Sequence, residues 1–441
     1  MICFVKTILT QKNRLKLKGE SLKMLQLLAY HTARLYNVGL YEVRQHYFEH
    51  KKYLSYAKSY HICKTNENYA LLLSDTAQQV LRLVDRNFKS FFGLLKAKKQ
   101  GKYDNKVKIP KYKNKEETWI IPVQGRSVRL KNGRAIIGLS KAFCEKYQPS
   151  IKKLEFPLPK NIQAKKLQEI RILPVARGFE IEYVYQKEVQ PKKLNEAKHL
   201  SIDLGLNNLA SCFDSTSGSS FAIDGRYIKA INQRYNKETA RLKSIKDQQK
   251  YRHSTRRMTR LCEKRKWRIN DYFNRSVKKI TDYCVANDIG TLVMGDFKTI
   301  KQNSNMGKRN NQNFVQIPYD LLKRKLKGKC EQLGIGFSLN EESYTSKCSF
   351  LDKEAIQKHE KYQGRRIKRG LFRTNNRILV NADINGSANI LQKYLTSKHR
   401  QEELFFERVC KGFVNNPVRV KLSDMLFSSS KAPSIARVSP A

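Results

Sequence analysis

Two aspartates in the second half of the chain have the surroundings of metal-binding carboxylates. Asp203 lies in the apolar run His199–Leu204, with Gly205 after it. An aspartate in an apolar strand is costly to bury unless its charge is compensated, and Mg²⁺, which prefers carboxylate oxygens, would compensate it. Asp383 lies near the start of an expected helix. Either aspartate alone is a weak signal, since Asp is also a common helix cap, but the pair predicts a magnesium site.

The segments around these aspartates follow the order of an RNase H-like α/β domain, which we expect over residues 199–421. Three short strands come first, a basic helical insert over 227–286 follows, and the chain then alternates strand, helix, strand and helix. Asp203 falls on the first strand and Asp383 at the start of the last helix. The expected elements are strands His199–Leu204, Leu209–Phe213, Ser220–Ile223, Thr291–Met294 and Ile335–Leu339, and helices Tyr319–Leu333 and Asp383–Tyr394.

The first half predicts a β-barrel that is split by a helical insert. Alternating patterns over 1–20 and 101–190, with the turn dipeptide Asn132-Gly133, favour strands. Residues 21–100 have apolar spacing typical of helices and form the expected recognition lobe. We interpret 191–198 as a linker and the Ser- and Ala-rich tail 422–441 as disordered. The Asn-rich stretch Lys301–Asn313 is a candidate loop near the site.

The charge of the chain is extreme and spread over most of its length. There are 88 Lys and Arg against 38 Asp and Glu, a formal net charge of +50, and the pI is about 10.0. A chain with this excess repels itself unless a polyanion accompanies it, so we expect a long nucleic-acid channel. The alternative is an ordinary protein with a charged surface.

Two segments are candidates for the nucleic-acid contacts. One is a helix with an apolar stripe and a basic face; the alternative, a solvated charged helix, lacks enough acids to pair its cations. The other is the extended basic stretch 102–113, whose alternative is a plain surface loop. The candidate residues are Arg252, Arg256, Arg257, Arg260, Lys264, Arg265, Lys266 and Arg268 on the helix, and Lys111 and Tyr112 in the stretch.

The cysteines and the apolar segments argue for a cytoplasmic protein. Nine cysteines are present and no two are spaced as C-x-x-C, so neither a zinc ribbon nor a redox pair is predicted. No segment has the roughly 18 or more apolar residues of a membrane span. The first ten residues favour a strand over a signal peptide. We therefore expect a cytoplasmic location and no membrane partner.

Four motifs resemble the TnpB (OrfB) family of transposon-encoded proteins, which is related to type V CRISPR effector nucleases. They are IDLGLNN at 202–208, the basic helix 253–280, YTSK at 344–347 and ADINGSANI at 382–390. The resemblance runs through essentially the whole chain. It implies an RNA-guided DNA endonuclease with a wedge barrel, a recognition lobe and a RuvC domain. The implied partners are a structured guide RNA, target double-stranded DNA and a separate transposase encoded by the same element.

One departure from the family concerns the third carboxylate, which is usually a Glu at the end of the fourth strand. This chain has Gly295 there, and Asp296 is one residue on, where a side chain points to the opposite face. Neighbouring parallel strands lie about 4.8 Å apart, which an extended Glu side chain spans. Glu342, at the end of the next strand, is therefore our candidate, with Glu341 and Asp296 as alternatives. A lost carboxylate is the remaining possibility.

A second departure is the family's zinc ribbon, which is degenerate here over 343–381. Only Cys348 remains of its cysteine pairs, and a basic run, Arg365–Gly370, follows. Zinc is not predicted. This segment is either held by packing alone or mobile.

The expected chemistry is cleavage by two Mg²⁺ ions held by Asp203, Glu342 and Asp383. In such sites one ion activates the attacking water and the other stabilises the leaving oxygen. Two alternatives stay open. One is an RNA-guided DNA-binding protein with a disabled nuclease, which Gly295 would favour. The other is a transposase that joins strands itself, since transposases share this fold.

Overall fold

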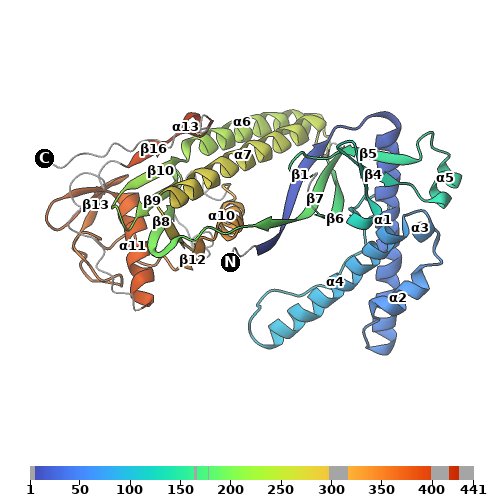
Figure 1. The fold of residues 1–441 in the computed structure, drawn as a ribbon, viewed down its shortest axis with the longest axis horizontal. Coiled ribbons are helices and arrows are strands. Elements are labelled where there is room, and N and C mark those ends of the chain that lie inside the picture. The colour runs from blue at the N-terminus through green and yellow to red at the C-terminus, as the bar shows by residue number, and fades with distance from the viewer. Residues whose placement is uncertain (1–4, 163–165, 177, 297–315, 399–416, 427–441) are drawn as a thin grey trace. The chain divides into compact units, whose positions relative to one another are not determined.

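The structure is a computed structural model that describes residues 5–162, 166–176, 178–296, 316–398 and 417–426 (Figure 1). The chain divides into two compact units. One comprises Lys6–Glu188, and the other comprises Val189–Ala441 together with Met1–Val5. Each unit has its own hydrophobic core. The candidate loop Lys301–Asn313 lies outside the described residues.

The helices of the first unit lie where the apolar spacing predicted them. α1 (Gly19–His50) packs against α4 (Ser74–Lys99), and the shorter α2 (Tyr56–Cys63) and α3 (Glu67–Ala70) come between them in the sequence. On α4 the buried side chains include Val80, Val84 and Phe88, which follow the 3.6-residue period of a helix. These aromatic and apolar residues form core.

The strands of the first unit form two sheets rather than one barrel. The first sheet has the order β1-β7-β6-β2, and the second has the order β3-β4-β5. No pairing joins the two sheets within the described residues, so the predicted barrel is not confirmed. The strands are β1 (Val5–Leu15), β2 (Ile121–Gln124), β3 (Arg129–Lys131), β4 (Arg134–Gly138), β5 (Lys153–Pro157), β6 (Lys166–Val175) and β7 (Gly178–Val189).

Two short helices complete this unit, a 3₁₀ turn at Gly125–Ser127 and α5 (Lys141–Tyr147). The predicted turn at Asn132-Gly133 joins β3 to β4. Both of its residues have positive φ, 49° and 67°, as a two-residue hairpin turn of this kind requires.

The second unit is built on one six-stranded sheet with the order β12-β11-β8-β9-β10-β16. Strands β8, β9 and β10 pair antiparallel, whereas β11 pairs parallel with both β8 and β12. This is the predicted succession of elements. The strands are β8 (Asn195–Leu204), β9 (Asn208–Asp214), β10 (Ser220–Asp224), β11 (Ile289–Gly295), β12 (Gly336–Asn340) and β16 (Val418–Val420).

Two predicted boundaries of this unit were wrong. β8 begins at Asn195, inside the segment 191–198 that was interpreted as a linker, because Asn195 pairs with Ile289 of β11. The tail 422–441 is not wholly irregular: α13 (Leu422–Leu426) contacts α7, and Met425 is buried. Residues 427–441 lie outside the described residues.

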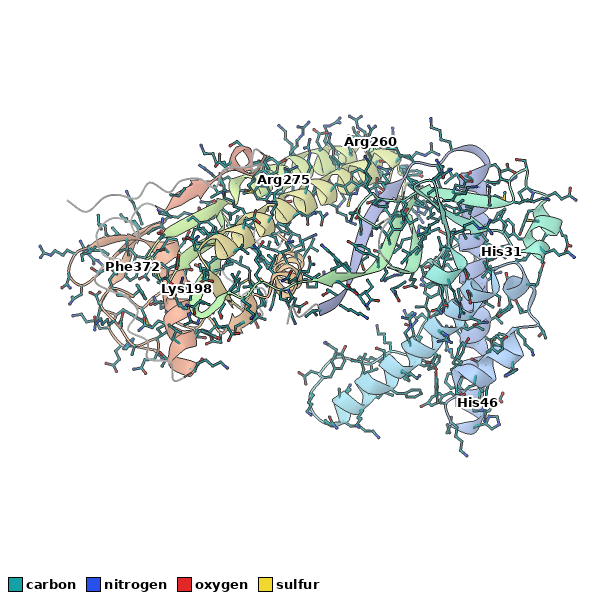
Figure 2. The ribbon with its side chains drawn as sticks, viewed as in Figure 1. His31, His46, Lys198, Arg260, Arg275 and Phe372 are labelled. Carbon is teal, nitrogen blue, oxygen red and sulfur yellow. The ribbon has the colours of Figure 1, made fainter. Side chains whose placement is uncertain are left out.

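Four long helices pack around this sheet. The helical insert predicted over 227–286 is two helices, α6 (Arg226–Gln248) and α7 (Arg256–Ala286), which run side by side (Figure 1). α10 (Tyr319–Leu333) contacts α7, and α11 (Ala382–Ser397) lies on β8, β9 and β11. α7 carries both Arg260 and Arg275 (Figure 2). Trp267 of α7 is 42% exposed.

The predicted zinc-ribbon-like segment contains a small antiparallel sheet. Its strands are β13 (Arg365–Lys368), β14 (Leu371–Arg373) and β15 (Leu379–Asn381). Phe372 of β14 (Figure 2) is buried. It shares one cluster with Phe350 and apolar residues of α11. The buried carboxylate of Glu354 accepts hydrogen bonds from the backbone N–H of Ser349 and of Gln363. Thus the described part of this segment is held by packing and by a buried carboxylate.

Among the described residues, none of the helices combines the length and the apolar character that crossing a bilayer requires.

Candidate active site

Asp203 stands on the central strand of the second unit, directly beneath α11. It pairs in register with Ser211 of β9. A Cβ atom added to Gly386 of α11 would lie 2.9 Å from Oδ2 of Asp203. One residue on, Oγ of Ser387 lies 3.0 Å from Oγ of Ser201, two residues before Asp203 on β8. The small residues of the 382–390 motif therefore let the helix approach the strand closely.

Asp383 is held at the N-terminus of α11 by its neighbours. The side chain of Asn381 caps the helix and accepts hydrogen bonds from the N–H of Asp383 and of Ile384. Asn208 donates from Nδ2 to Oδ2 of Asp383 at 2.8 Å, and a guanidinium nitrogen of Arg366 lies 3.5 Å from Oδ1. Since α11 packs on β8, the fold brings Asp383 beside Asp203.

Glu342 fills the space that the missing side chain of Gly295 leaves open. Gly295 ends β11 and pairs with Asn340 at the end of β12. A Cβ atom built on Gly295 would lie only 1.5 Å from Oε1 of Glu342 and 2.4 Å from its Cδ. The carboxyl group of Glu342 thus occupies the position toward which a side chain at 295 would point. Its Oε1 is buried and has no hydrogen-bond partner among the described residues.

The charges of these carboxylates oppose one another. Burial, and then the charges of Glu342 and Asp383, raise the pKa of Asp203 well above its usual range. Burial, followed by the charges of Asp296 and Glu341, raises the pKa of Glu342 to about 7. Carboxylates that are desolvated and near like charges resist ionisation. A cation placed among them would relieve both costs.

The two alternative carboxylates, Asp296 and Glu341, each form an ion pair with a lysine. Oδ1 of Asp296 accepts a hydrogen bond from Nζ of Lys323 at 2.8 Å. Glu341 is exposed, pairs with Lys393 and accepts hydrogen bonds from Ser343. The pKa of Glu341 is lowered, because these hydrogen bonds outweigh the effect of its burial. Of the three candidates, Glu342 is the one with a buried carboxylate oxygen that has no hydrogen-bond partner among the described residues.

Asp203, Glu342 and Asp383 line one open cleft with a volume of about 790 Å³, and arginines form its rim. Two of these arginines flank Asp224, which pairs with Arg226 at 2.9 Å and lies 3.9 Å from Arg419. The basic run around Arg366 is visible in the sequence. No sequence pattern predicts that β16 brings Arg419 to this cleft. The rim arginines are Arg226, Arg366, Arg369 and Arg419.

Within the described residues, no group of three or more His, Cys, Asp and Glu side chains is arranged to hold a metal ion as it stands. The charges of Glu342 and Asp383 both act on Asp203 and help to raise its pKa. Each of the three carboxylates is half-buried.

The loop after Asp203 is fixed by residues that the sequence analysis did not identify. The buried hydroxyl of Tyr319 donates to the carbonyl of Gly205 at 2.8 Å, and burial, then the charge of Asp203, raise its pKa. The N–H of Gly225 donates to the carbonyl of Asn207. A Cβ at Gly225 would lie 2.3 Å from the carbonyl oxygen of Leu206, so glycine is needed for this close approach.

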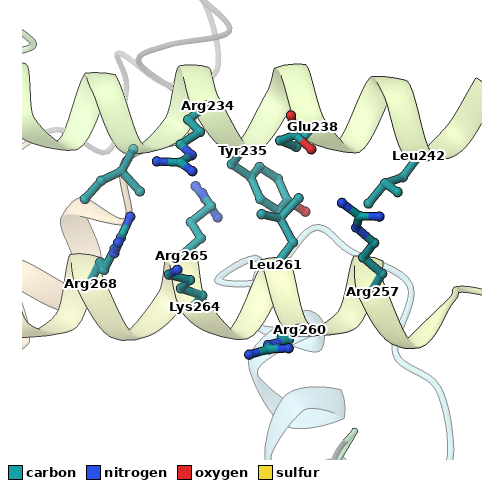
Figure 3. Close-up of a pocket in the computed structure, with 11 residues that line it drawn as sticks. Arg234, Tyr235, Glu238, Leu242, Arg257, Arg260, Leu261, Lys264, Arg265 and Arg268 are labelled. Carbon is teal, nitrogen blue, oxygen red and sulfur yellow. The ribbon is translucent and has the colours of Figure 1, made fainter.

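The basic residues predicted on the helical insert gather along α6 and α7. A groove of about 280 Å³ lies between the two helices, and arginine and lysine side chains line it (Figure 3). Of the predicted cations, Arg257, Arg260, Lys264 and Arg268 line the groove and are exposed. Arg256 and Lys266 are exposed elsewhere on α7, and Arg252, predicted on the helix, is exposed between the end of α6 and the start of α7. Arg234 of α6 also lines the groove and was missed.

Arg265 differs from its neighbours, because its guanidinium serves the fold. It donates to Oδ1 of Asn232 at 2.7 Å and to the carbonyl of Gln316 at 2.8 Å, and it lies over the ring of Tyr235. These hydrogen bonds join α7 to α6 and to Gln316, just before α10, while the side chain also lines the groove. A contact of Arg265 with nucleic acid stays a prediction.

Lys111 and Tyr112 lie in the first unit and are exposed. The guanidinium of Arg44 lies 4.8 Å from the ring centre of Tyr112. The following residue, Lys113, exchanges two hydrogen bonds with the side-chain amide of Asn37 on α1. This part of the basic stretch is therefore docked on α1 and is not a free loop.

Comparison with known proteins gives one family and several solved structures. Residues 182–301 match the OrfB_IS605 family, described as probable transposase. The structure resembles Cas12f1 in its complex with sgRNA and target DNA, with 17% identity, a TM-score of 0.61, and coverage of 84% of this chain and 82% of that one. No curated protein matches.

A second solved structure, the mini-RNA-guided endonuclease CRISPR-Cas_phi3, matches with 9% identity and a TM-score of 0.43 over 89% of this chain and 92% of that one. The likeness to Cas12f1 extends over most of both chains and concerns the fold. The matched family segment includes β8 with Asp203 and the α6–α7 pair. The predicted resemblance to the TnpB (OrfB) family is thereby confirmed, with the family match itself extending over residues 182–301.

Proposed function

We propose that this protein is an RNA-guided, metal-dependent DNA endonuclease encoded by a transposable element. The observation that carries the proposal is the placement of Glu342. Its carboxyl group takes the space in front of Gly295 and faces the same cleft as Asp203 and Asp383. The strand order β12-β11-β8-β9-β10, with a helix across β8, supports an RNase H-like (RuvC-type) domain.

The residues of the cleft fit a divalent cation. Three carboxylates with hard oxygens converge there, two of them have raised pKa values, and one buried oxygen of Glu342 has no partner among the described residues. Asp203, Glu342 and Asp383 would hold the ions, with Asp203 between the other two. Bound there, magnesium supplies the activation of water and the stabilisation of charge on the leaving oxygen.

The other residues of the cleft bind and orient. Asn208 keeps one oxygen of Asp383 in place, and Tyr319 fixes the backbone just after Asp203. Arg226, Arg369 and Arg419 can bind the phosphates of a DNA strand as it enters the cleft, since guanidinium groups recognise phosphate well. Arg366, which now lies near Asp383, would turn to a phosphate once a cation takes over the carboxylate.

The guide RNA and the heteroduplex would lie on the basic surface of α6 and α7. The exposed cations there include Arg257, Arg260 and Lys264, and an A-form duplex is read by shape through its backbone. Lys111 and Tyr112 of the first unit are additional candidate contacts. A net charge of +50 agrees with a partner that is a long polyanion.

A second candidate is an RNA-guided binding protein without cleavage. It is favoured by Gly295 and by the absence, among the described residues, of a ready-made group of three metal ligands. The two candidates make opposite predictions for a single experiment.

The protein should be purified with co-expressed RNA from the end of its element and incubated with a target plasmid and Mg²⁺. We expect guide-dependent cleavage that is lost in Asp203→Ala and Glu342→Ala. Guide-dependent target binding without any cleavage by the unmutated complex would instead establish the second candidate. Joined DNA products in the absence of RNA would point to a strand-joining transposase.

A further inference from the structure

We propose that Asn385 and Asn389 of α11 are positioning residues that hold Glu342 in the site. This inference rests on the proposed function and assigns a role to two amides that do not themselves face the cleft. Both side chains are buried, at 1% and 0% exposure. They lie one helical turn apart, so that they project from the same face of α11.

Glu342 needs such support because of where it stands. β12 is an edge strand of the six-stranded sheet, and none of its residues is fully buried. Glu342 lies beyond its last residue, Asn340, so no strand pairing fixes it. A carboxylate at position 295 would instead grow from β11, an interior strand that is paired on both sides.

The two asparagines form hydrogen bonds with the backbone that follows Glu342. Nδ2 of Asn389 donates to the carbonyl oxygens of Thr345 and Cys348, at 2.8 and 2.7 Å. Nδ2 of Asn385 donates to the carbonyl of Cys348 at 2.9 Å, and its Oδ1 accepts from the N–H of Phe350 at 3.0 Å. Four hydrogen bonds therefore tie the turn 345–350 to α11.

This turn is connected directly to Glu342. Thr345 donates to the carbonyl of Glu342 from both Oγ1, at 2.8 Å, and its backbone N–H, at 3.2 Å. On the other side of Glu342, Nδ2 of Asn340 donates to the carbonyl of Ile390 on α11 at 2.9 Å. Glu342 is thus bracketed by two anchor points on the helix that carries Asp383, which fixes the distance between the two carboxylates.

An asparagine at position 389 does not maximise the stability of the folded protein. Its Nδ2 has two carbonyl partners, which sets the orientation of the amide, and its Oδ1 is then buried without a partner among the described residues. An unsatisfied buried oxygen costs free energy. The geometry therefore indicates that Asn389 serves to hold the carbonyl groups of Thr345 and Cys348 through its side-chain N–H groups.

The decisive test moves the carboxylate back to the interior strand. In the Gly295→Glu, Glu342→Gly double variant the glutamate grows from β11 and no longer depends on the turn. We expect Asn389→Ala to lower guide-dependent cleavage about 10- to 100-fold in the parent, as loss of outer support for metal ligands does. In the double variant the same substitution should have an effect within about threefold. An equal loss in both backgrounds would overturn the proposal.

A second measurement does not depend on cleavage. Mn²⁺ should raise the unfolding temperature of the parent protein, and we expect Asn389→Ala to lose most of this increase, as Glu342→Gln does. Thr281→Ala removes a buried hydroxyl on α7 that bonds to Val277 and serves as the control for destabilisation alone. A variant Asn389→Ala that is less stable yet keeps the full Mn²⁺ effect would refute positioning, whether or not the double variant folds.

A different result is expected if the protein is not a metal-dependent nuclease. In that case the parent complex neither cleaves nor responds to Mn²⁺, and the positioning role falls with it. Cleavage and a Mn²⁺ response that both survive Asn389→Ala would reject the positioning role alone.

Discussion

The two sides of the carboxylate cleft are built in different ways. Asp203 and Asp383 stand where β8 and α11 meet at closest approach, with Gly386 and Ser387 removing bulk between them. Glu342 stands beyond the end of an edge strand and is bracketed by side-chain amides. Asp203 and Asp383 stand on elements that pack directly together, with hydrogen bonds to Asn208 and Asn381 orienting Asp383. Glu342 depends on hydrogen bonds alone, so its side of the cleft is the more easily disturbed.

A carboxylate can thus change its place in the sequence while keeping its place in space. Gly295 and Asn340 are register partners, and the side chain of Glu342 reaches back over Gly295. Two adjacent parallel strands end at the same edge of a sheet, so either can deliver a group to the same cleft. The two positions differ in the contacts that are needed to hold the carboxylate in the cleft.

The largest effect is expected on the packed side. Asp203→Asn should lower cleavage about a thousandfold or more, since bound metal is worth several kcal/mol to the reaction. The same variant should unfold at a higher temperature without metal at neutral pH, because burial and the charges of Glu342 and Asp383 make the ionised aspartate costly. Cleavage assays and thermal unfolding of the metal-free protein measure the two effects.

Asp288→Asn is the matched control, because Asp288 is an exposed aspartate of the same unit that pairs with Lys198. It should change neither quantity. A metal-free Asp203→Asn protein that is less stable than the parent would show that repulsion between the carboxylates is not the dominant cost there.

The edge side should be exchangeable, whereas the packed side is not. Glu342→Gly alone should lower cleavage about 100-fold, and adding Gly295→Glu should recover at least about tenfold, since the new side chain points into the vacated space. Gly295→Glu alone should destabilise the protein, because its carboxyl group and that of Glu342 would occupy the same space. Plasmid cleavage by the three variants measures the exchange, and no recovery in the double variant would argue against equivalence of the two positions.

The difference between the two sides also explains what the sequence could predict. Asp203 and Asp383 can be identified because an apolar strand and a helix start surround them. Glu342 is predicted from the family resemblance, which implies a glutamate where this chain has Gly295, together with the spacing of neighbouring strands. Asn208, Tyr319 and the amides of α11 act through tertiary contacts that no local pattern encodes. The sequence also could not tell that Arg265 joins α7 to α6, or that β16 completes the sheet, since both depend on which surfaces meet.

The pH dependence of metal-free stability should show the contribution of Glu342, to which the raised pKa of Asp203 adds. Burial raises the folded pKa of Glu342 to about 7 from an ordinary value of 4.5. Between these values the folded protein binds more protons than the unfolded chain, so metal-free stability should fall as pH rises from about 4.5 to 7. Glu342→Gln should flatten this slope, as measured by unfolding temperature across the window. A slope unchanged by the substitution would assign it to other groups.

The smallest effect is expected for the glutamate next to Glu342. Glu341 is exposed, and its carboxylate is held by Lys393 and Ser343 away from the cleft. An exposed ion pair contributes at most about 1 kcal/mol, so Glu341→Gln should change cleavage by less than about threefold and leave the Mn²⁺ response intact. Parallel assays of Glu341→Gln and Glu342→Gln measure the contrast. Because the two residues are adjacent, equal losses in both variants would mean that the turn as a whole, rather than the one carboxylate in front of Gly295, is what the site requires.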